Sequence, residues 1–394
     1  MVRTGSLFSQ LLDLFPRNQF QGSVKAEQAE RYGKGFTCWE QFVAMLFCQL
    51  AQAHSLREIC DGLSCCLGKL IHVGVREAPK RSTLSYANKH RPWQLYERVF
   101  YQLLEKCRLD LSGVGALAAS RRKFRFRNKL LSLDASVIDL CVSLFDWAKF
   151  RQTKGAVKLH LLLDHEGYLP VFAQITPGDV HEVNVAQQLH FPAGSIVVVD
   201  RGFTDYSLFA RWSEEGVYFV TRQKANAVYE VVEKRKTPRK GGILSDEIIR
   251  FTGWQAKRDC PHHLRRITYH DSASDKTFTF LTNHLHFGPT TIARIYKDRW
   301  QIELFFKALK QNLKIKTFVG TSANALKIQI WTALIAMLLL KYLQLRSRLN
   351  WALSNLVALL RWNLFTYRDL WIWIDNPFNT PPQHPIPVQL KLRL

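Results

Sequence analysis

The spacing of apolar residues along the chain changes character twice. In residues 1–120 apolar positions recur with helical spacing, as between Glu40 and Gln52. From Leu130 they alternate with polar residues or form short β-branched runs, which is typical of strands. After Gly320 the spacing is helical again. The pattern predicts an α/β protein in which helical N-terminal and C-terminal regions flank a strand-rich centre.

The centre has the pattern of a mixed sheet. The run from Ser195 to Asp200 is β-branched without alternation, as expected of a central strand covered on both faces. Asp200 ends this strand, at the edge where open α/β sheets carry their ligand sites. The order predicted is strands at 130–140, 157–164, 169–175, 195–200 and 217–222, with helices at 182–189 and 206–215.

Between Arg222 and Pro289 the apolar period is again two. Strands are predicted at 227–232, 243–252, 264–269 and 277–282, which make residues 223–287 a β-rich insertion. Basic pairs and triplets accompany it, at Lys234–Lys236, Arg239–Lys240 and Arg265–Arg266.

The N-terminal region, residues 1–120, contains two short helices predicted at 56–63 and 84–89. Ser55 and Glu58 have the spacing of a capping box, and Ser82-Thr83 is expected to cap the second helix. The second helix is rich in hydrogen-bonding and basic side chains, which suits a helix-turn-helix that enters the DNA major groove. A purely structural helical pair with a polar outer face fits the same pattern.

The C-terminal region, residues 319–394, is helical and rich in tryptophan, which either fills a core or buries a dimer contact. Ile330–Leu340 is apolar but too short to span a membrane, so a buried helix is expected. Five prolines between Asn376 and Pro387 predict an extended tail.

Charge narrows the class of partner. The chain has 55 Lys and Arg against 32 Asp and Glu, a formal net charge of +23, which favours a polyanion such as nucleic acid. An anionic membrane surface or simple solubility also fits this charge. The eight cysteines form no Cys-x-x-Cys pair and are expected to be reduced, as in the cytoplasm, and no secretion signal is visible in Met1–Gln21.

The densest combination of charge and aromatic residues is a predicted helix over Tyr296–Lys316. Helical geometry puts Glu303 on one face with basic and hydroxyl side chains, beside a stripe of apolar residues. A carboxylate in this setting suits a metal ion or a phosphate backbone. An ordinary amphipathic helix with salt-bridge spacing gives the same pattern. The residues that share the face are Tyr296, Arg299, Glu303, Lys307 and Lys310.

The spacing within this helix is specific. Two residues separate Tyr296 from Arg299, three separate Arg299 from Glu303, and six separate Glu303 from Lys310. This spacing resembles the signature of the Tyr-Arg-Glu-Lys branch of bacterial DDE insertion-sequence transposases, insertion-sequence family four. Three upstream segments also resemble this branch: Asp134-Ala-Ser136, Asp200–Phe203 and Gly216–Arg222. The resemblance covers residues 125–320 well and both ends more loosely.

The resemblance implies a ribonuclease-H-like catalytic core at 125–222 and 288–318, interrupted by the insertion at 223–287, behind an N-terminal DNA-binding domain. It implies that Asp134, Asp200 and Glu303 are both the catalytic and the metal-binding residues. Two Mg²⁺ ions, with Mn²⁺ as a substitute, would cut and join DNA. The implied DNA contacts are Tyr296, Arg299, Trp300, Lys307, Lys310 and Arg222.

The implied protein is a cytoplasmic bacterial transposase, associated with the nucleoid when bound to DNA. Its substrates would be double-stranded terminal repeats and target DNA, and it would act as a homodimer in a synaptic complex. Two other hypotheses stay open: a domesticated or inactive DNA-binding protein, and a structure-specific nuclease with the same fold and metals.

Overall fold

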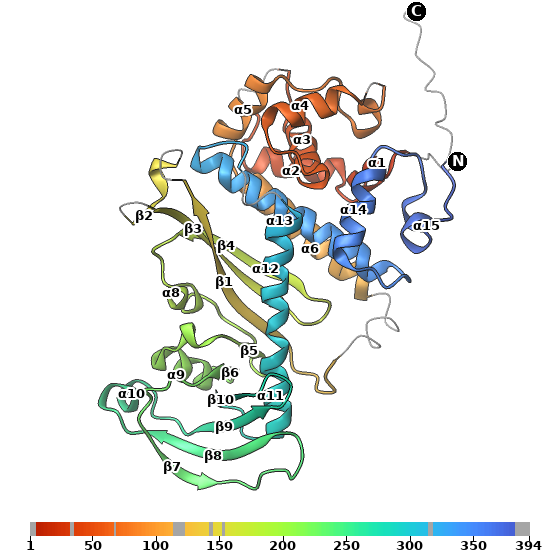
Figure 1. The fold of residues 1–394 in the computed structure, drawn as a ribbon. Helices are drawn as coiled ribbons and strands as arrows, with labels where there is room; N and C mark the ends of the chain where they lie inside the picture. Colours follow the sequence, from red (N-terminus) through yellow and green to blue (C-terminus); the bar gives the residue numbers. More distant parts are fainter. Residues whose placement is uncertain are drawn as a thin grey trace, which may run out of the picture. The chain divides into compact units, whose positions relative to one another are not determined.

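The computed structural model describes residues 5–31, 35–66, 68–112, 123–141, 145–151, 154–313 and 318–382. The chain divides into two compact units (Figure 1). One comprises Met1–Ala119, Leu140–Lys149 and Lys307–Leu394, and the other Ser120–Asp139 and Phe150–Phe306. Each unit is described by itself.

The second unit is built on one mixed sheet with the strand order β2-β3-β1-β5-β6-β10-β9-β8-β7, and β4 pairs with β3 (Figure 1). The central strands β1, β5 and β6 are parallel, whereas β3 and β4 form an antiparallel hairpin. The strands are β1 Leu130–Leu140, β2 Lys149–Arg151, β3 Lys154–Asp164, β4 Leu169–Pro177, β5 Ile196–Val198 and β6 Tyr218–Arg222. The α/β class and the five strands predicted for the centre are confirmed.

The β-rich insertion continues this sheet. Strand β10 pairs antiparallel with β6, and β9, β8 and β7 follow outward. All four predicted strands are present, as β7 Tyr229–Lys234, β8 Ile243–Phe251, β9 Leu264–Asp271 and β10 Lys276–Thr282, with helix α10 Trp254–Asp259 between β8 and β9.

Side-chain alternation assigns each face of the central strands to its own core. Leu131 and Leu133 pack with Phe209 and Trp212 of helix α9 Tyr206–Glu214. Leu130 belongs to the other core, with the apolar side of helix α11 Pro289–Asp298. Even-numbered residues at the start of β1 therefore face the α11 side. The predicted helix at 182–189 is shorter, α8 Glu182–Ala186.

Helices make up the first unit: α1 Leu7–Leu12, α2 Arg17–Ala26, α3 Cys38–Ala51, α4 Leu56–Ser64, α5 Arg81–His90, α6 Gln94–Ser112, α13 Ala323–Arg346, α14 Leu353–Asn363 and α15 Leu370–Asp375. Helix α13 packs against α6 and α3. By length and composition alone it could cross a membrane, but 83% of its most apolar window is buried in the protein. The prediction of a buried helix at 330–340 is confirmed.

Of the two helix caps predicted in this unit, the cap at Ser82-Thr83 is wrong and the capping box at Ser55 is half formed. Ser82 and Thr83 do not cap α5, because the helix already begins at Arg81 after Lys80, with no side-chain cap. Ser55 accepts a hydrogen bond from the backbone N–H of Glu58, but the Glu58 carboxylate accepts from His54 rather than from Ser55's own N–H. The segment between α4 and α5 contains a 3₁₀ turn, Leu70–Val73, so the two helices are not joined by a tight turn.

Candidate active site

Strand register brings two of the predicted acidic residues together. In the parallel pair β1 and β5, Ser132 lies opposite Val198. Two residues further along each of these two segments, the same register leads to Asp134 and Asp200. Asp200 follows the end of β5, where its carboxylate accepts a hydrogen bond from the Gly202 N–H at 2.7 Å. Both carboxylates therefore lie at neighbouring strand positions.

The predicted single helix over 296–316 is two helices. Helix α11 ends at Asp298 and helix α12, Trp300–Asn312, begins one residue after Arg299. At the junction the Arg299 N–H bonds to the carbonyl of Tyr296, three residues back, at 3.1 Å. The chain keeps a helical sense through this tightened turn, so Arg299 and Glu303 still lie one turn apart.

Arg299 joins the first and third acidic residues. Its Nη1 lies 3.1 Å from Asp134 Oδ2, and its Nη2 donates a hydrogen bond to Glu303 Oε1. The Arg299 side chain is only 12% exposed, so this double ion pair is largely shielded from water. The contact brings a residue of β1 and a residue of α12 to a common point.

The electrostatics tie all three carboxylates together. Burial raises the pKa of Asp134 to about 6; Arg299 and the Ala135 N–H oppose this rise, whereas the charges of Asp200 and Glu303 add to it. For Arg299, burial alone would lower the pKa, but Tyr296 and the Asp134 and Glu303 carboxylates outweigh it and the pKa is raised. Asp200 and Glu303 thus both lie within electrostatic reach of Asp134.

Two more predicted residues adjoin this cluster. The ring of Tyr296 packs on Phe280, with centroids 4.9 Å apart, and lies 5.5 Å from the Arg299 guanidinium carbon. Burial raises the pKa of Tyr296, and the charges of Arg299 and Arg222 oppose that rise. Val220, two residues before Arg222 on β6, belongs to the core against which Tyr296 packs, so strand alternation puts Arg222 on the same side of the sheet as Tyr296.

The remaining predicted residues lie along α12. Trp300 is 56% exposed, which is unusual for so large a ring. Lys307 is exposed and Lys310 partly buried, four and seven residues beyond Glu303. Both belong to the part of α12 that clusters with the helical unit.

A divalent cation fits the chemistry of this cluster but not its present spacing. Hard carboxylate oxygens are the ligands that Mg²⁺ prefers. Among the described residues, however, no three His, Cys, Asp or Glu side chains are grouped closely enough to hold a metal ion. The cation that Asp134 and Glu303 share here is the Arg299 guanidinium.

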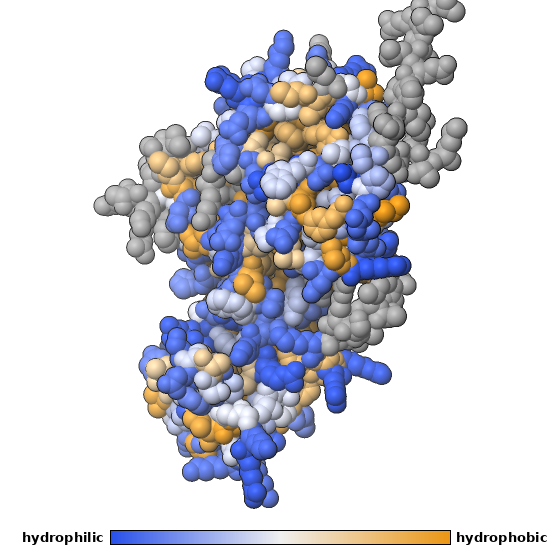
Figure 2. Space-filling model, turned by 45° about the vertical axis from the view of Figure 1, so that its right-hand side comes forward, coloured by the Kyte–Doolittle hydropathy of each residue, from blue (hydrophilic) through white to orange (hydrophobic). Residues whose placement is uncertain are grey.

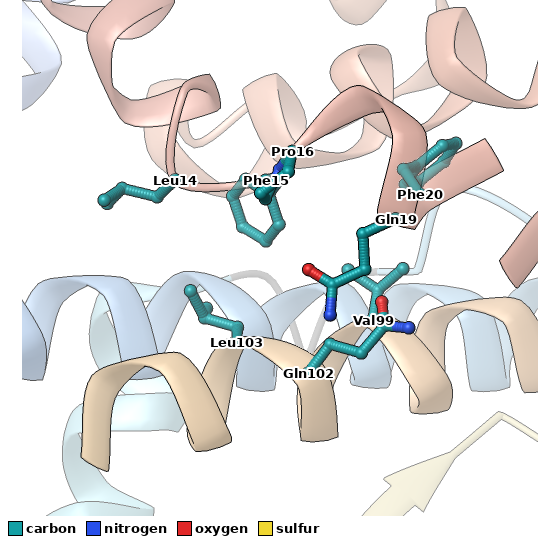
Figure 3. Close-up of a pocket in the computed structure, with 8 residues that line it drawn as sticks. All are labelled: Leu14, Phe15, Pro16, Gln19, Phe20, Val99, Gln102 and Leu103. Carbon is teal, nitrogen blue, oxygen red and sulfur yellow. The ribbon is translucent and has the colours of Figure 1, made fainter. Parts of the chain in front are cut away.

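A pocket elsewhere does not carry this chemistry. It lies in the helical unit (Figure 3) and is lined mainly by apolar side chains, with no charged residue among them. The residues that line the pocket include Phe15, Phe20, Val99 and Leu103, with Gln19 and Gln102.

Hydrophilic residues cover most of the face drawn in Figure 2, with apolar patches between them.

The mixed sheet with three parallel central strands has the ribonuclease-H-like fold. In it Asp134 lies within β1, Asp200 directly follows β5, and Glu303 lies on a helix that contacts β1 through Arg299. The model of the transposase DDE domain matches residues 125–339, and a domain of unknown function (DUF4372) matches residues 3–76. The chain belongs to the DDE-domain transposase family. Members cleave DNA and transfer its strands, and they depend on divalent metal ions.

Curated relatives agree with this assignment. A putative transposase, y4zB, of Sinorhizobium fredii is 29% identical over 78% of this chain and 83% of its own. A probable transposase for insertion sequence element IS5377 of Geobacillus stearothermophilus is 29% identical over 69% of this chain and 70% of its own. A cryo-EM structure of a piggyBac transposase synaptic complex with hairpin DNA covers 95% of this chain and 81% of that chain at TM-score 0.42 and 10% identity, too low to add to the assignment.

Sequence reasoning missed one part of the cluster and its surroundings. The Arg299–Glu303 spacing was visible, but the Asp134 partner lies 165 positions away and leaves no local signal. Asp298 and His165 were also missed as neighbours of the cluster, because an acidic residue in a helix and a histidine in a turn are unremarkable in sequence.

Proposed function

We propose that Asp134, Asp200 and Glu303 together hold two Mg²⁺ ions, for which Mn²⁺ can substitute. The observation that supports this most is the Arg299 guanidinium shared by Asp134 and Glu303, with Asp200 close enough to raise the Asp134 pKa. A cluster of carboxylates that already binds one cation is suited to bind others. When bound, the ions would activate water, stabilise the attacked phosphate and neutralise the leaving oxygen.

Arg299 has a second role in this proposal. It must release at least one carboxylate before that oxygen can bind a metal ion, and the released guanidinium is then free to bind a DNA phosphate bidentately. Tyr296 and Arg222 adjoin it and would hold neighbouring phosphates. Lys307 and Lys310 would extend this contact along α12. Trp300, more than half exposed, offers a surface for an unstacked base.

The N-terminal domain, residues 1–120, would recognise the terminal inverted repeats of the element. Helix α5 supports this, since it contains no acidic residue. Tyr86 and His90 stack at a ring distance of 4.1 Å on its exposed side. Such a face fits a groove edged by phosphates. The exposed side chains of α5 are Arg81, Ser82, Ser85, Tyr86, Lys89 and His90.

The whole reaction would be cut-and-paste transposition of the protein's own insertion sequence. Two element ends must be joined to one target, so a homodimer in the synaptic complex is expected. The protein would work in the bacterial cytoplasm, on the nucleoid.

The test is strand transfer with duplexes that carry the inverted repeats flanking the gene. Wild type should nick these ends and join them to a target plasmid only when Mg²⁺ or Mn²⁺ is present. Glu303→Gln should bind the same duplex and do neither. Asp139→Asn is the matched control, since Asp139 is an exposed carboxylate on the same strand as Asp134.

The alternatives give different results. DNA binding by wild type without any metal-dependent nicking would favour a domesticated DNA-binding protein. Nicking without joining would favour a structure-specific nuclease. Equal activity of wild type and Glu303→Gln would refute the assignment of the third carboxylate.

A further inference from the structure

A buried chain of hydrogen bonds lies directly beside the acidic cluster. Asp298, the residue before Arg299, lies 2.6 Å from His165 Nδ1 through Oδ2. His165 Nε2 lies 2.7 Å from Ser132 Oγ, and Ser132 precedes Asp134 by two residues on β1. Ser132 is 0% and Asp298 2% exposed, so water contributes little to these bonds.

These contacts close a ring. From Ser132 the path runs along β1 to Asp134, across the ion pair to Arg299, back one residue to Asp298, and through His165 to Ser132. The ring holds strand β1 and the junction of α11 and α12 at one fixed separation. Because Asp134 lies on β1 and Glu303 follows the junction by one helical turn, this separation also determines how far the two carboxylates lie from each other.

Other contacts strengthen the anchor at Asp298. Lys123 Nζ donates to Asp298 Oδ1, and the Tyr168 hydroxyl donates to Oδ2 at 3.1 Å. Burial alone would raise the pKa of Asp298, but the bonds from His165 and Lys123 outweigh it and the pKa is lowered, so this carboxylate is ionised at neutral pH. Asp298, the last residue of α11, is thereby bound to the turn between β3 and β4 at the point where α11 ends.

A Ser–His–Asp chain can also activate a serine nucleophile. That reading fails here, because Ser132 is fully buried and its Oγ is out of reach of any substrate. The remaining role for these hydrogen bonds is to hold the neighbouring side chains in position.

We propose that Ser132, His165 and Asp298 are positioning residues, which set the pose of Arg299 and Glu303 against Asp134. The proposal rests on the proposed function, in which Asp134 and Glu303 hold the metal ions. It predicts that breaking this hydrogen-bond path slows the chemical step and leaves the affinity for DNA unchanged, because none of the three side chains is more than 5% exposed.

The experiment cuts the same link from both sides, in the full-length protein. Ser132→Ala removes the hydroxyl, and His165→Asn keeps a donor for Asp298 while losing the reach to Ser132. Each should lower kcat for strand transfer about tenfold with KM for the end duplex unchanged, since a misplacement of about 1 Å can cost up to a hundredfold. The double variant should be no slower than either single one, because the link can be cut only once.

Thr176→Val is the matched control. Thr176 Oγ1 lies 2.9 Å from Nε2 of the buried His160 in the same hairpin, outside the ring. Its loss should change kcat by less than about twofold at a similar cost in stability, which thermal melting measures.

The positioning role is overturned if Ser132→Ala and His165→Asn both keep the wild-type kcat, or if they raise only KM. It is also overturned if the losses multiply in the double variant, or if Thr176→Val loses as much kcat as they do. If wild type itself neither nicks nor joins DNA, the proposed function fails instead. Activity in wild type with none in Glu303→Gln keeps the two questions separate.

Discussion

Replacing Asp134 by asparagine should stabilise the protein in the absence of metal while abolishing DNA cleavage. The Asp134 side chain is 18% exposed, and burial raises its pKa from 3.8 to about 6. An acid whose pKa is higher in the folded state is harder to ionise there, so it destabilises the fold once the pH exceeds the unfolded value. At about 1.4 kcal/mol per pKa unit, the full cost is about 3 kcal/mol.

The pH dependence carries the test. Below about pH 3 Asp134 is protonated in both states and costs almost nothing, whereas the cost grows to about 1.5 kcal/mol at pH 5 and levels off at about 3 kcal/mol above pH 7. Chemical denaturation in EDTA should therefore show an advantage of Asp134→Asn that is larger at pH 8 than at pH 5. A constant offset from the substitution itself cancels in this comparison.

The same unfolding experiment is repeated with Mg²⁺ and with a control variant. Mg²⁺ should raise the unfolding free energy of wild type by mass action and leave Asp134→Asn unchanged. Asp139→Asn, on the same strand but exposed, should show no pH-dependent gain in stability and should be stabilised by Mg²⁺ as much as wild type. The reasoning is refuted if the advantage of Asp134→Asn is the same at both pH values, or if Mg²⁺ stabilises the variant as much as wild type.

Three further substitutions test other parts of the account. In Gly202→Ala the new Cβ would lie 2.9 Å from Asp200 Oδ1, so cleavage should fall at least about tenfold while the melting temperature changes little; unchanged cleavage would argue against Asp200. Arg265→Met leaves Asp246 buried without its bidentate partner and should cost about 3–5 kcal/mol in urea unfolding, and a loss below about 1 kcal/mol would contradict this. Lys307→Ala should weaken binding to all duplex sequences and reduce the salt slope of binding by about 1, whereas an unchanged slope would remove Lys307 from the DNA contact.

The strands and the order of the acidic residues could be predicted because they depend on local pattern. The runs around Leu131 and Val197 are apolar enough to identify buried strands, and each leads to an aspartate. The resemblance of the motif around Glu303 then supplied the third residue. Strand pairing could not be derived in this way, because the register of β1 against β5 is set by packing between segments far apart in sequence.

The break at Arg299 had no sequence signal. Neither proline nor glycine lies near it, and the apolar stripe runs on from Ile295 to Ile302. At the same point Asp298 is bound to His165, 133 positions earlier. Contacts of this kind arise only once the sheet has formed, which is why the helix was predicted as continuous.

The central claim is that Asp134, Asp200 and Glu303 share divalent cations. Anomalous scattering from crystals grown with Mn²⁺ and an end duplex tests it directly. We expect Mn²⁺ peaks bounded by oxygens of all three carboxylates, with Arg299 turned from at least one of them toward a phosphate. Mn²⁺ bound at other residues, with Arg299 still bridging Asp134 and Glu303 beside the DNA, would contradict the account.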